Sequence, residues 1–227
     1  MSASSPQLPL GIALPESATL AGYVAGANGA ALTALRGLAA GDRLYLHGPA
    51  ASGKSHLLQA VCRASPGRAA YLPLGELAGH PPAVLDGLEG LDRVCLDEVD
   101  AVAGDRGWEE ALVGFLDGLR ARGTAVVAAG PRPADELGLA LPDLASRLAW
   151  GAVYALQPLD DEGKRRLLCR RAEARGLAMP PEVADFVIRR APRDVRALLT
   201  LLDRLDRASL AAKRRLTVPF VKTVLDA

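Results

Sequence analysis

The chain has 227 residues, of which 50% are hydrophobic and 23% are charged, with 27 Lys and Arg against 26 Asp and Glu. This composition is typical of a globular protein with one sizeable core and a smaller second domain, and it excludes extensive disorder. The formal net charge of +1 gives no overall attraction to nucleic acid or to a membrane surface.

The cysteines and the N-terminus bear on the cellular compartment. Cys62, Cys95 and Cys169 are far apart in the sequence and lack C-x-x-C spacing, which favours reduced thiols over disulfides or a zinc site. The sequence shows neither a signal peptide nor an apolar run of the roughly 18 residues that a membrane helix needs. We therefore expect a cytoplasmic protein that does not associate with membranes.

Strand and helix patterns alternate over the first two thirds of the chain. Strands are expected at 44–47, 69–74, 93–96, 124–129 and 153–156, with helical segments from 55, at 82–88, at 108–120 and at 142–150. This alternation predicts an α/β domain with a five-stranded parallel sheet.

From residue 160 on, the pattern is helical only. Amphipathic stretches are expected at 160–175, 181–191, 194–208 and 218–225, each preceded by a Pro, Asp or Thr start signal. We therefore expect a flexible N-terminal tail at 1–15, the α/β domain at 16–158 and a small helical domain at 159–227.

A phosphate-binding sequence follows the first strand directly. Residues 48–55 read GPAASGKS and match G-x-x-x-x-G-K-[ST] in full. The glycines allow successive backbone N–H groups to face one anion, and the helix that follows adds its positive dipole end. Lys54 would reach the β- and γ-phosphates, and Ser55 would bind Mg²⁺. A Gly/Ala-rich turn that matches by chance is the alternative, and the strand before and the apolar helix after it argue against that. The residues assigned to the nucleotide from this segment are Gly48, Pro49, Ala50, Ala51, Ser52, Gly53, Lys54, Ser55 and His56.

A second strand ends in two carboxylates. Residues 93–98 read RVCLDE, which is typical of a Walker B element. Asp97 would hold Mg²⁺ through water, and Glu98 would orient the water that attacks the γ-phosphate. Acidic residues also end strands merely because strand ends meet solvent, so this interpretation depends on the phosphate loop.

Six segments in chain order resemble the AAA+ module of the DnaA initiator family and, within it, the Hda type of DnaA regulatory inactivator. They are residues 23–29, GPAASGKS, VCLDE, PRPADEL, LPDLASRLAWG and RDVRALL. The resemblance runs from about Leu8 to the end of the chain. It implies an AAA+ P-loop fold with a helical lid, an adenine nucleotide (ADP or ATP) with Mg²⁺, Arg147 as an arginine finger that acts on a neighbour's ATP, and Arg196 as a second sensor on the chain's own phosphates.

The same resemblance implies the partners. An inactivator of this type stimulates hydrolysis of DnaA-bound ATP and so regulates DNA replication initiation negatively. Initiators continue into a helix-turn-helix domain, whereas this sequence ends at Ala227, so we expect no sequence-specific DNA binding. The residues Gln7, Leu8, Leu10 and Ile12 resemble the Q-L-x-L-x-Φ peptide that docks on the DNA polymerase III sliding clamp. The alternative to clamp binding is an N-terminal tail in which the leucines occur by chance. A homodimer is a further possible partner arrangement.

The sequence also departs from the AAA+ pattern. The fourth strand ends in Ala128-Ala129-Gly130, where AAA+ ATPases usually carry a polar sensor-1 side chain, so we expect weak or no intrinsic hydrolysis. An autonomous AAA+ ATPase such as a helicase loader is the main alternative function, and the intact Glu98 favours it. A small-molecule P-loop kinase is disfavoured by the helical C-terminal domain. We further expect Arg147 to be exposed, distant from the chain's own phosphate loop and without a partner in the free protein.

Overall fold

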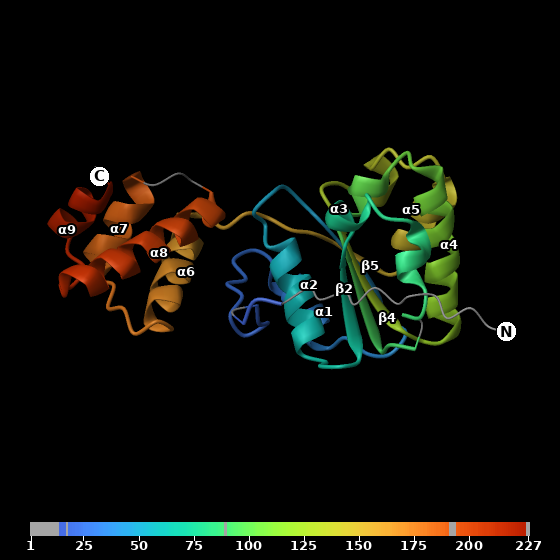
Figure 1. Ribbon diagram of the computed structural model, residues 1–227, viewed down its shortest axis with the longest axis horizontal. Coiled ribbons are helices and arrows are strands. Elements are labelled where there is room, and N and C mark those ends of the chain that lie inside the picture. The colour runs from blue at the N-terminus through green and yellow to red at the C-terminus, as the bar shows by residue number, and fades with distance from the viewer. Residues whose placement is uncertain (1–13, 17, 89, 191–193, 226–227) are drawn as a thin grey trace. The chain divides into compact units, whose positions relative to one another are not determined.

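The computed structural model describes residues 14–16, 18–88, 90–190 and 194–225, which form two compact units (Figure 1). The first unit comprises residues up to Tyr23 together with Asn28–Gln157, and the second comprises Val24–Ala27 together with Pro158–Ala227. The first is α/β and the second is helical, as expected. Across the described ranges, no helix combines the length and apolarity needed to cross a membrane.

The α/β unit contains the predicted five-stranded sheet, and all neighbouring strands pair in parallel in the order β2-β3-β4-β1-β5. The strands are β1 (Arg43–His47), β2 (Ala69–Pro73), β3 (Arg93–Asp97), β4 (Ala125–Gly130) and β5 (Ala152–Ala155). The interior strands β1, β3 and β4 are almost wholly buried, which explains their continuous apolar runs. Strand β5 closes one edge and leaves most of its residues exposed.

Helices cover both faces of the sheet. In Figure 1, α1 (Gly29–Arg36) and α2 (Lys54–Arg63) lie on one side, and α4 (Arg106–Ala121) and α5 (Pro142–Leu148) lie on the other. Short elements fill the connections: α3 (Leu74–Leu77) and the 3₁₀ turns η1 (Pro82–Leu85), η2 (Val99–Val102) and η3 (Ala134–Glu136). The helix expected at 82–88 is only this single turn, because the chain leaves helical geometry at Asp86 and Gly87 has φ +82°.

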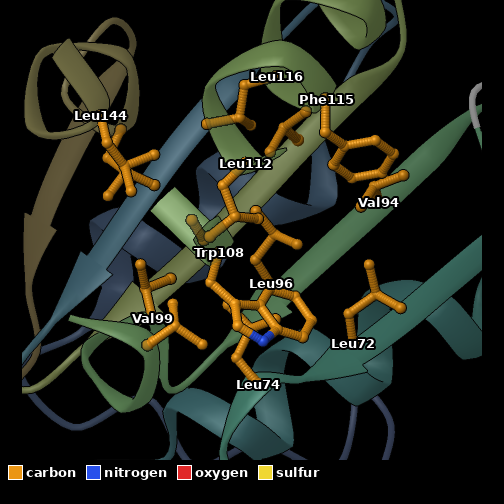
Figure 2. Packing of buried hydrophobic residues seen from close by; sticks show 14 of the residues in the cluster. Leu72, Leu74, Val94, Leu96, Val99, Trp108, Leu112, Phe115, Leu116 and Leu144 are labelled. Carbon is orange, nitrogen blue, oxygen red and sulfur yellow. The ribbon is translucent and has the colours of Figure 1, made fainter. Parts of the chain in front are cut away.

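The main core lies between the sheet and α4 (Figure 2). Trp108, Leu112 and Phe115 recur at helical spacing on one face of α4 and pack against β3, which contributes Val94 and Leu96. Trp108 is only 2% exposed, and its indole Nε1 donates to a backbone carbonyl at 3.2 Å. A buried tryptophan thus keeps its polar atom satisfied while it fills the interior.

One buried carboxylate fixes the start of α5. Glu109 is fully buried in the first turn of α4, and its Oε1 accepts from the backbone N–H groups of Gly104 (2.7 Å) and Ala140 (2.9 Å). Its Oε2 accepts from the N–H of Leu141 at 2.7 Å. Helix α5 begins at the next residue, Pro142. Because an unpaired buried carboxylate is costly, these bonds tie the α5 start to α4.

The second unit contains α6 (Asp161–Glu173), α7 (Pro181–Arg190), α8 (Val195–Ala212) and α9 (Val218–Leu225). Asp160 and Asp194 cap α6 and α8 by accepting from backbone N–H groups in the first turn, at 2.7 and 3.0 Å. The apolar faces of all four helices meet in one core, whose fully buried members include Val183, Leu202 and Val221. The expectation of a small helical domain is confirmed.

We expect Glu109→Gln to lower the free energy of unfolding by about 1–3 kcal/mol, because the amide –NH₂ would replace one acceptor and leave a backbone N–H unpaired. Urea denaturation measures this change. Glu110→Gln is the matched control, since Glu110 on the same helix makes only an exposed ion pair with Arg106, and it should change stability by less than about 0.5 kcal/mol. Equal effects of the two substitutions would contradict this role of Glu109.

Candidate functional site: a phosphate loop and an arginine cluster

The phosphate loop joins β1 to α2, and glycines determine its shape. A Cβ on Gly48 would overlap the backbone carbonyl of Leu156. Gly53 has φ +94°, and a Cβ there would lie 2.7 Å from Cε2 of Tyr23. Ala51 also has a positive φ, of 62°. Because residues with side chains rarely adopt such conformations, the loop is held in a specific, strained shape.

The segment before α1 is fastened to this loop. The Tyr23 hydroxyl donates to the carbonyl of Ser52 at 3.1 Å and accepts from the Asn28 amide at 3.0 Å. The Asn28 side chain also exchanges two hydrogen bonds with the backbone of Gln157, at 2.8 and 2.9 Å. The Tyr23 ring stacks on His56 with a centroid separation of 5.8 Å. His56, assigned to the nucleotide from the sequence, therefore lies against this N-terminal segment.

The polar groups of the loop suit an oxyanion. The Lys54 ammonium donates to the carbonyls of Gly48 (2.6 Å) and Pro49 (3.0 Å), so it is held at the loop. Burial lowers the pKa of Lys54, and the nearby carboxylate of Asp97 opposes that shift. The Ser52 hydroxyl is buried and has no hydrogen-bond partner among the described residues. An anchored ammonium, an unpaired hydroxyl and glycines at both ends of the loop together fit a phosphate group.

The Walker B carboxylate is oriented by a tyrosine that the sequence analysis did not identify. Asp97, 1% exposed, accepts from the Tyr71 hydroxyl on Oδ2 at 2.7 Å and from the backbone N–H of Glu98 on Oδ1 at 3.0 Å. Burial and the Asp97 charge raise the pKa of Tyr71, which keeps its hydroxyl protonated as a donor.

Glu98 has a strained backbone and lies beside α3. Its φ is +55°, in the left-handed region, which residues other than glycine rarely occupy. A Cβ on Gly75 would overlap the Glu98 carboxylate, so Glu98 extends over the first turn of α3. Strain of this kind is concentrated at functional sites.

The missing sensor 1 has a steric cause. Strand β4 ends at Gly130, where a Cβ would overlap the hydroxyl of Tyr45 and lie 3.2 Å from Leu137. The Tyr45 hydroxyl is fixed there by donation to the carbonyl of Arg132 at 2.8 Å. The space that a polar side chain at the end of β4 would need is therefore filled by Tyr45.

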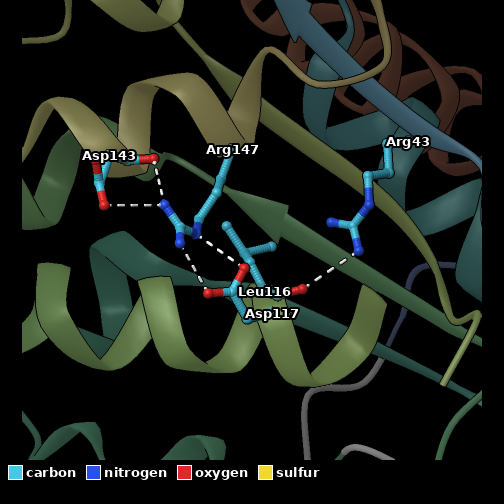
Figure 3. Close-up of polar contacts among 5 residues, drawn as sticks. All are labelled: Arg43, Leu116, Asp117, Asp143 and Arg147. Atoms are coloured by element: carbon cyan, nitrogen blue, oxygen red, sulfur yellow. Dashed lines mark hydrogen bonds and ion pairs between the residues drawn. The ribbon is translucent and has the colours of Figure 1, made fainter. Parts of the chain in front are cut away.

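Arg147 has partners, and the expectation that it has none in the free protein is wrong (Figure 3). Its Nε and Nη2 donate to the two carboxylate oxygens of Asp117 on α4, at 2.9 and 2.8 Å. Its Nη1 donates to the carbonyl of Asp143 at 3.2 Å. The Arg147 side chain is only 17% exposed. The bidentate pair raises the pKa of Arg147 and lowers that of Asp117, so both stay charged.

Arg147 lies at the end of the sheet opposite the phosphate loop. Its guanidinium is 5.2 Å from the ring centroid of Trp150, and the guanidinium of Arg43 is 5.8 Å from the same ring. Arg43 is the first residue of β1, whereas the phosphate loop begins directly after the last residue, His47. Four residue steps of a strand span about 13 Å.

The structure does not test two groups of predicted site residues. Arg196 lies near the start of α8 in the helical unit, where its side chain is exposed. Its contact with the nucleotide stays a prediction. The predicted clamp-binding residues Gln7, Leu8, Leu10 and Ile12 lie outside the described residues.

Sequence reasoning missed three residues that organise these sites. Tyr71 stands on the strand next to β3, and an aromatic hydroxyl beside a Walker B strand is a usable signal. Glu109 follows an Asp N-cap, which suggests only a helix start. Asp117 is 30 residues from Arg147 in the sequence and carries no local signal at all.

Comparisons with known proteins agree with this architecture. Residues 161–225 match the family described as the Hda lid domain. Domain III of the replication initiation protein DnaA from Thermotoga maritima superposes with a TM-score of 0.79 at 22% identity, over 94% of this chain and 98% of that one. AMPPCP-bound DnaA from Aquifex aeolicus gives 0.69 at 20% identity, over 85% and 66%. The Thermotoga maritima RuvB Holliday junction branch migration motor gives 0.62 at 20% identity, over 82% and 61%.

A parallel sheet in this strand order, a phosphate loop after β1, a carboxylate pair at the end of β3 and a helical unit that follows define the AAA+ P-loop fold. The family match of the helical unit points to one type within this fold, the Hda type. Residues 161–225 thus match the Hda lid domain family, and the chain as a whole has a DnaA-like AAA+ fold.

We expect Lys54→Ala to weaken binding of Mg-ADP about 10- to 100-fold, because hydrogen bonds to a charged group contribute roughly 1.5–3 kcal/mol. Isothermal titration calorimetry measures the affinity. Lys222→Ala, which removes an exposed lysine from α9, is the control and should leave it unchanged. Unchanged Mg-ADP affinity in the Lys54 variant would exclude this loop as the nucleotide site.

Proposed function

We propose that this protein is a regulatory AAA+ adaptor that, while bound to the DNA-loaded sliding clamp, stimulates hydrolysis of DnaA-bound ATP and so limits replication initiation. Arg147 would supply the arginine finger in trans. The protein would bind an adenine nucleotide with Mg²⁺ through Lys54, Ser55 and Asp97, and that nucleotide would serve a structural role.

The position of Arg147 is the observation that carries the proposal. It lies at the end of the sheet opposite the chain's own phosphate loop, beside the partly exposed Trp150. From there it could serve only ATP that belongs to another subunit. An arginine supplied in trans accelerates phosphoryl transfer by roughly 10³- to 10⁵-fold in P-loop systems. The lid match to Hda and the DnaA-like fold support DnaA as the recipient.

Because Arg147 is paired with Asp117 in the free protein, it must change partners before it can act as an arginine finger. Two of the guanidinium edges donate to Asp117 and Asp143 in the free protein, so Arg147 has to exchange a carboxylate for a phosphate when the partner arrives. Both are oxyanions of similar bidentate geometry, which makes such an exchange chemically reasonable. Asp117 would then hold the guanidinium in place until docking.

The main rival is an autonomous ATPase, such as a helicase loader. The complete Walker B pair and the RuvB-like fold favour it. The packing of Tyr45 against Gly130 opposes it, because no polar side chain at the end of β4 can hold the attacking water. The rate of ATP hydrolysis by the isolated protein separates the two functions: the adaptor requires a negligible rate, and the motor a substantial one.

We expect Arg147→Ala to abolish stimulation of DnaA-bound ATP hydrolysis, with a loss of about 10³-fold or more, and Arg147→Lys to restore little of it, because lysine cannot donate bidentately. Hydrolysis of radiolabelled ATP on DnaA, with clamp-loaded DNA present, measures the effect. Nucleotide binding by the variant itself should remain.

Asp117→Ala distinguishes a finger from a structural arginine. This substitution breaks the same ion pair but leaves the guanidinium in place, so a finger predicts that most of the stimulation survives. If Asp117→Ala and Arg147→Ala lose stimulation equally, the pair acts by bracing α5 against α4, and the finger assignment is wrong.

We expect simultaneous replacement of Gln7, Leu8 and Leu10 by alanine to abolish clamp binding, because it removes the anchors of the peptide. The melting temperature should stay within about 1 °C, since terminal residues seldom stabilise a domain. Gel filtration with purified clamp and a thermal melt test both statements. Co-elution of the variant with clamp would place the docking site elsewhere.

A further inference from the structure

The two units of the chain carry net charges of opposite sign. Residues 158–227 contain 16 Lys and Arg against 10 Asp and Glu, whereas residues 1–157 contain 11 against 16. The formal charge of +1 for the whole chain therefore conceals an acidic α/β unit and a basic helical unit. Because charge creates a local field wherever it is concentrated, the partners of the helical unit have to be considered separately.

Five basic residues gather at the C-terminal end of α8 (Figure 1). Arg204 and Arg207 lie on the exposed face of the helix, and Lys213, Arg214 and Arg215 follow at its end and in the turn to α9. All five are exposed, and within the described ranges none of them forms an ion pair with a carboxylate. We call these five residues the α8 basic surface. It spans about 14 Å of helix from Arg204 to Lys213.

Neutral groups orient the arginines of this surface. The Nη2 of Arg204 donates to the backbone carbonyl of Val224 at 3.0 Å, and the Nε of Arg207 donates to that of Asp203 at 3.2 Å. The guanidinium of Arg214 lies 5.3 Å from the ring centroid of a phenylalanine on α9. These contacts do not neutralise the positive charge, and one hydrogen bond uses only one of the five N–H donors of a guanidinium. The side chains therefore suit phosphate oxygens, which arginine binds bidentately.

The turn after α8 has a defined backbone. Lys213 has φ +50°, in the left-handed region, where helices usually end in glycine. Its N–H donates to the carbonyl of Leu210 at 3.2 Å, and the N–H of Arg214 donates to that of Ser209 at 3.1 Å. The Ser209 hydroxyl donates to the carbonyl of Arg214 at 2.6 Å. Three consecutive basic residues are thus held in place, one of them where glycine would be less strained.

We propose that the α8 basic surface binds the phosphate backbone of duplex DNA without sequence preference. A duplex carries about one negative charge per 1.7 Å of its axis, so an extended row of cations meets several phosphates at once. Backbone contacts carry no sequence information, which agrees with the expected lack of sequence-specific binding. The inference extends the proposed function, because a protein tethered to clamp-loaded DNA experiences a high local concentration of duplex.

Two other polyanions fit the surface less well. Single strands are bound by stacking bases on aromatic side chains, but the helical unit has only Phe186 and Phe220, and neither is exposed. An anionic membrane requires a whole apolar helix face. In the described part of the helical unit, Leu210 is the only large hydrophobic side chain that is exposed.

Fluorescence anisotropy of a labelled duplex of arbitrary sequence, titrated with the full chain at several salt concentrations, tests the proposal without clamp or DnaA. We expect the logarithm of the association constant to fall linearly with the logarithm of the salt concentration, by about 0.9 per phosphate contacted. Arg207→Gln combined with Arg215→Gln should flatten this slope by about 2 and weaken binding at low salt about tenfold or more. The variant's affinity for Mg-ADP should not change.

A second double variant is the matched control. Arg189→Gln combined with Arg190→Gln gives the same composition and the same net charge, but it removes two exposed arginines from the end of α7. That end is close in sequence to the start of α8, and Lys213 lies about 27 Å further along the helix. The control should change the salt slope by less than about 0.5. Equal losses in the two double variants would mean that only net charge matters, and the surface would be wrong.

The remaining outcomes separate this inference from the proposed function. Wild type that binds phosphatidylglycerol vesicles, or itself in gel filtration, but not the duplex would overturn the inference. Hydrolysis of DnaA-bound ATP on clamp-loaded DNA is measured in parallel. Stimulation by wild type without any duplex binding overturns the α8 basic surface and leaves the adaptor function intact. Duplex binding that depends on Arg207 and Arg215, without stimulation, supports the surface and overturns the adaptor function.

Discussion

Strand β1 is the element on which both sites depend. It is paired on both sides, with β4 and β5, and its three central residues are buried. The phosphate loop begins where the strand ends, and the arginine cluster gathers where it starts. Because a doubly paired strand cannot shorten or bend easily, the two cationic sites are kept at a constant separation. One is the phosphate loop, and the other lies at the opposite end of the sheet.

The loop at the first of these sites could be predicted from local sequence. The phosphate loop could be recognised from residues 48–55 because its chemistry depends on backbone conformations that Gly48 and Gly53 alone allow. The parallel sheet could be predicted for a related reason, since buried parallel strands need continuous apolar runs between helical segments. In both cases the physical requirement is local, so it produces a recognisable pattern in consecutive residues.

The second site could be predicted only in part. The sequence identified Arg147 through a resemblance, but it could not supply Asp117, which approaches from α4 through packing of α4 against α5. Nor could it supply Glu109, which sets the start of α5 by accepting from three backbone groups in two other segments. Partners of this kind are decided by tertiary structure, and any acidic residue on α4 would have looked equally suitable in the sequence.

The packing of Tyr45 against Gly130 has a consequence for how this protein can change over evolutionary time. A side chain at position 130 cannot be gained by one substitution, because Tyr45 fills its space and is itself anchored to Arg132. Shrinking Tyr45 first would leave a cavity in the core and destabilise the fold. Each single step is unfavourable alone, so a side chain at position 130 requires a coupled change at Tyr45.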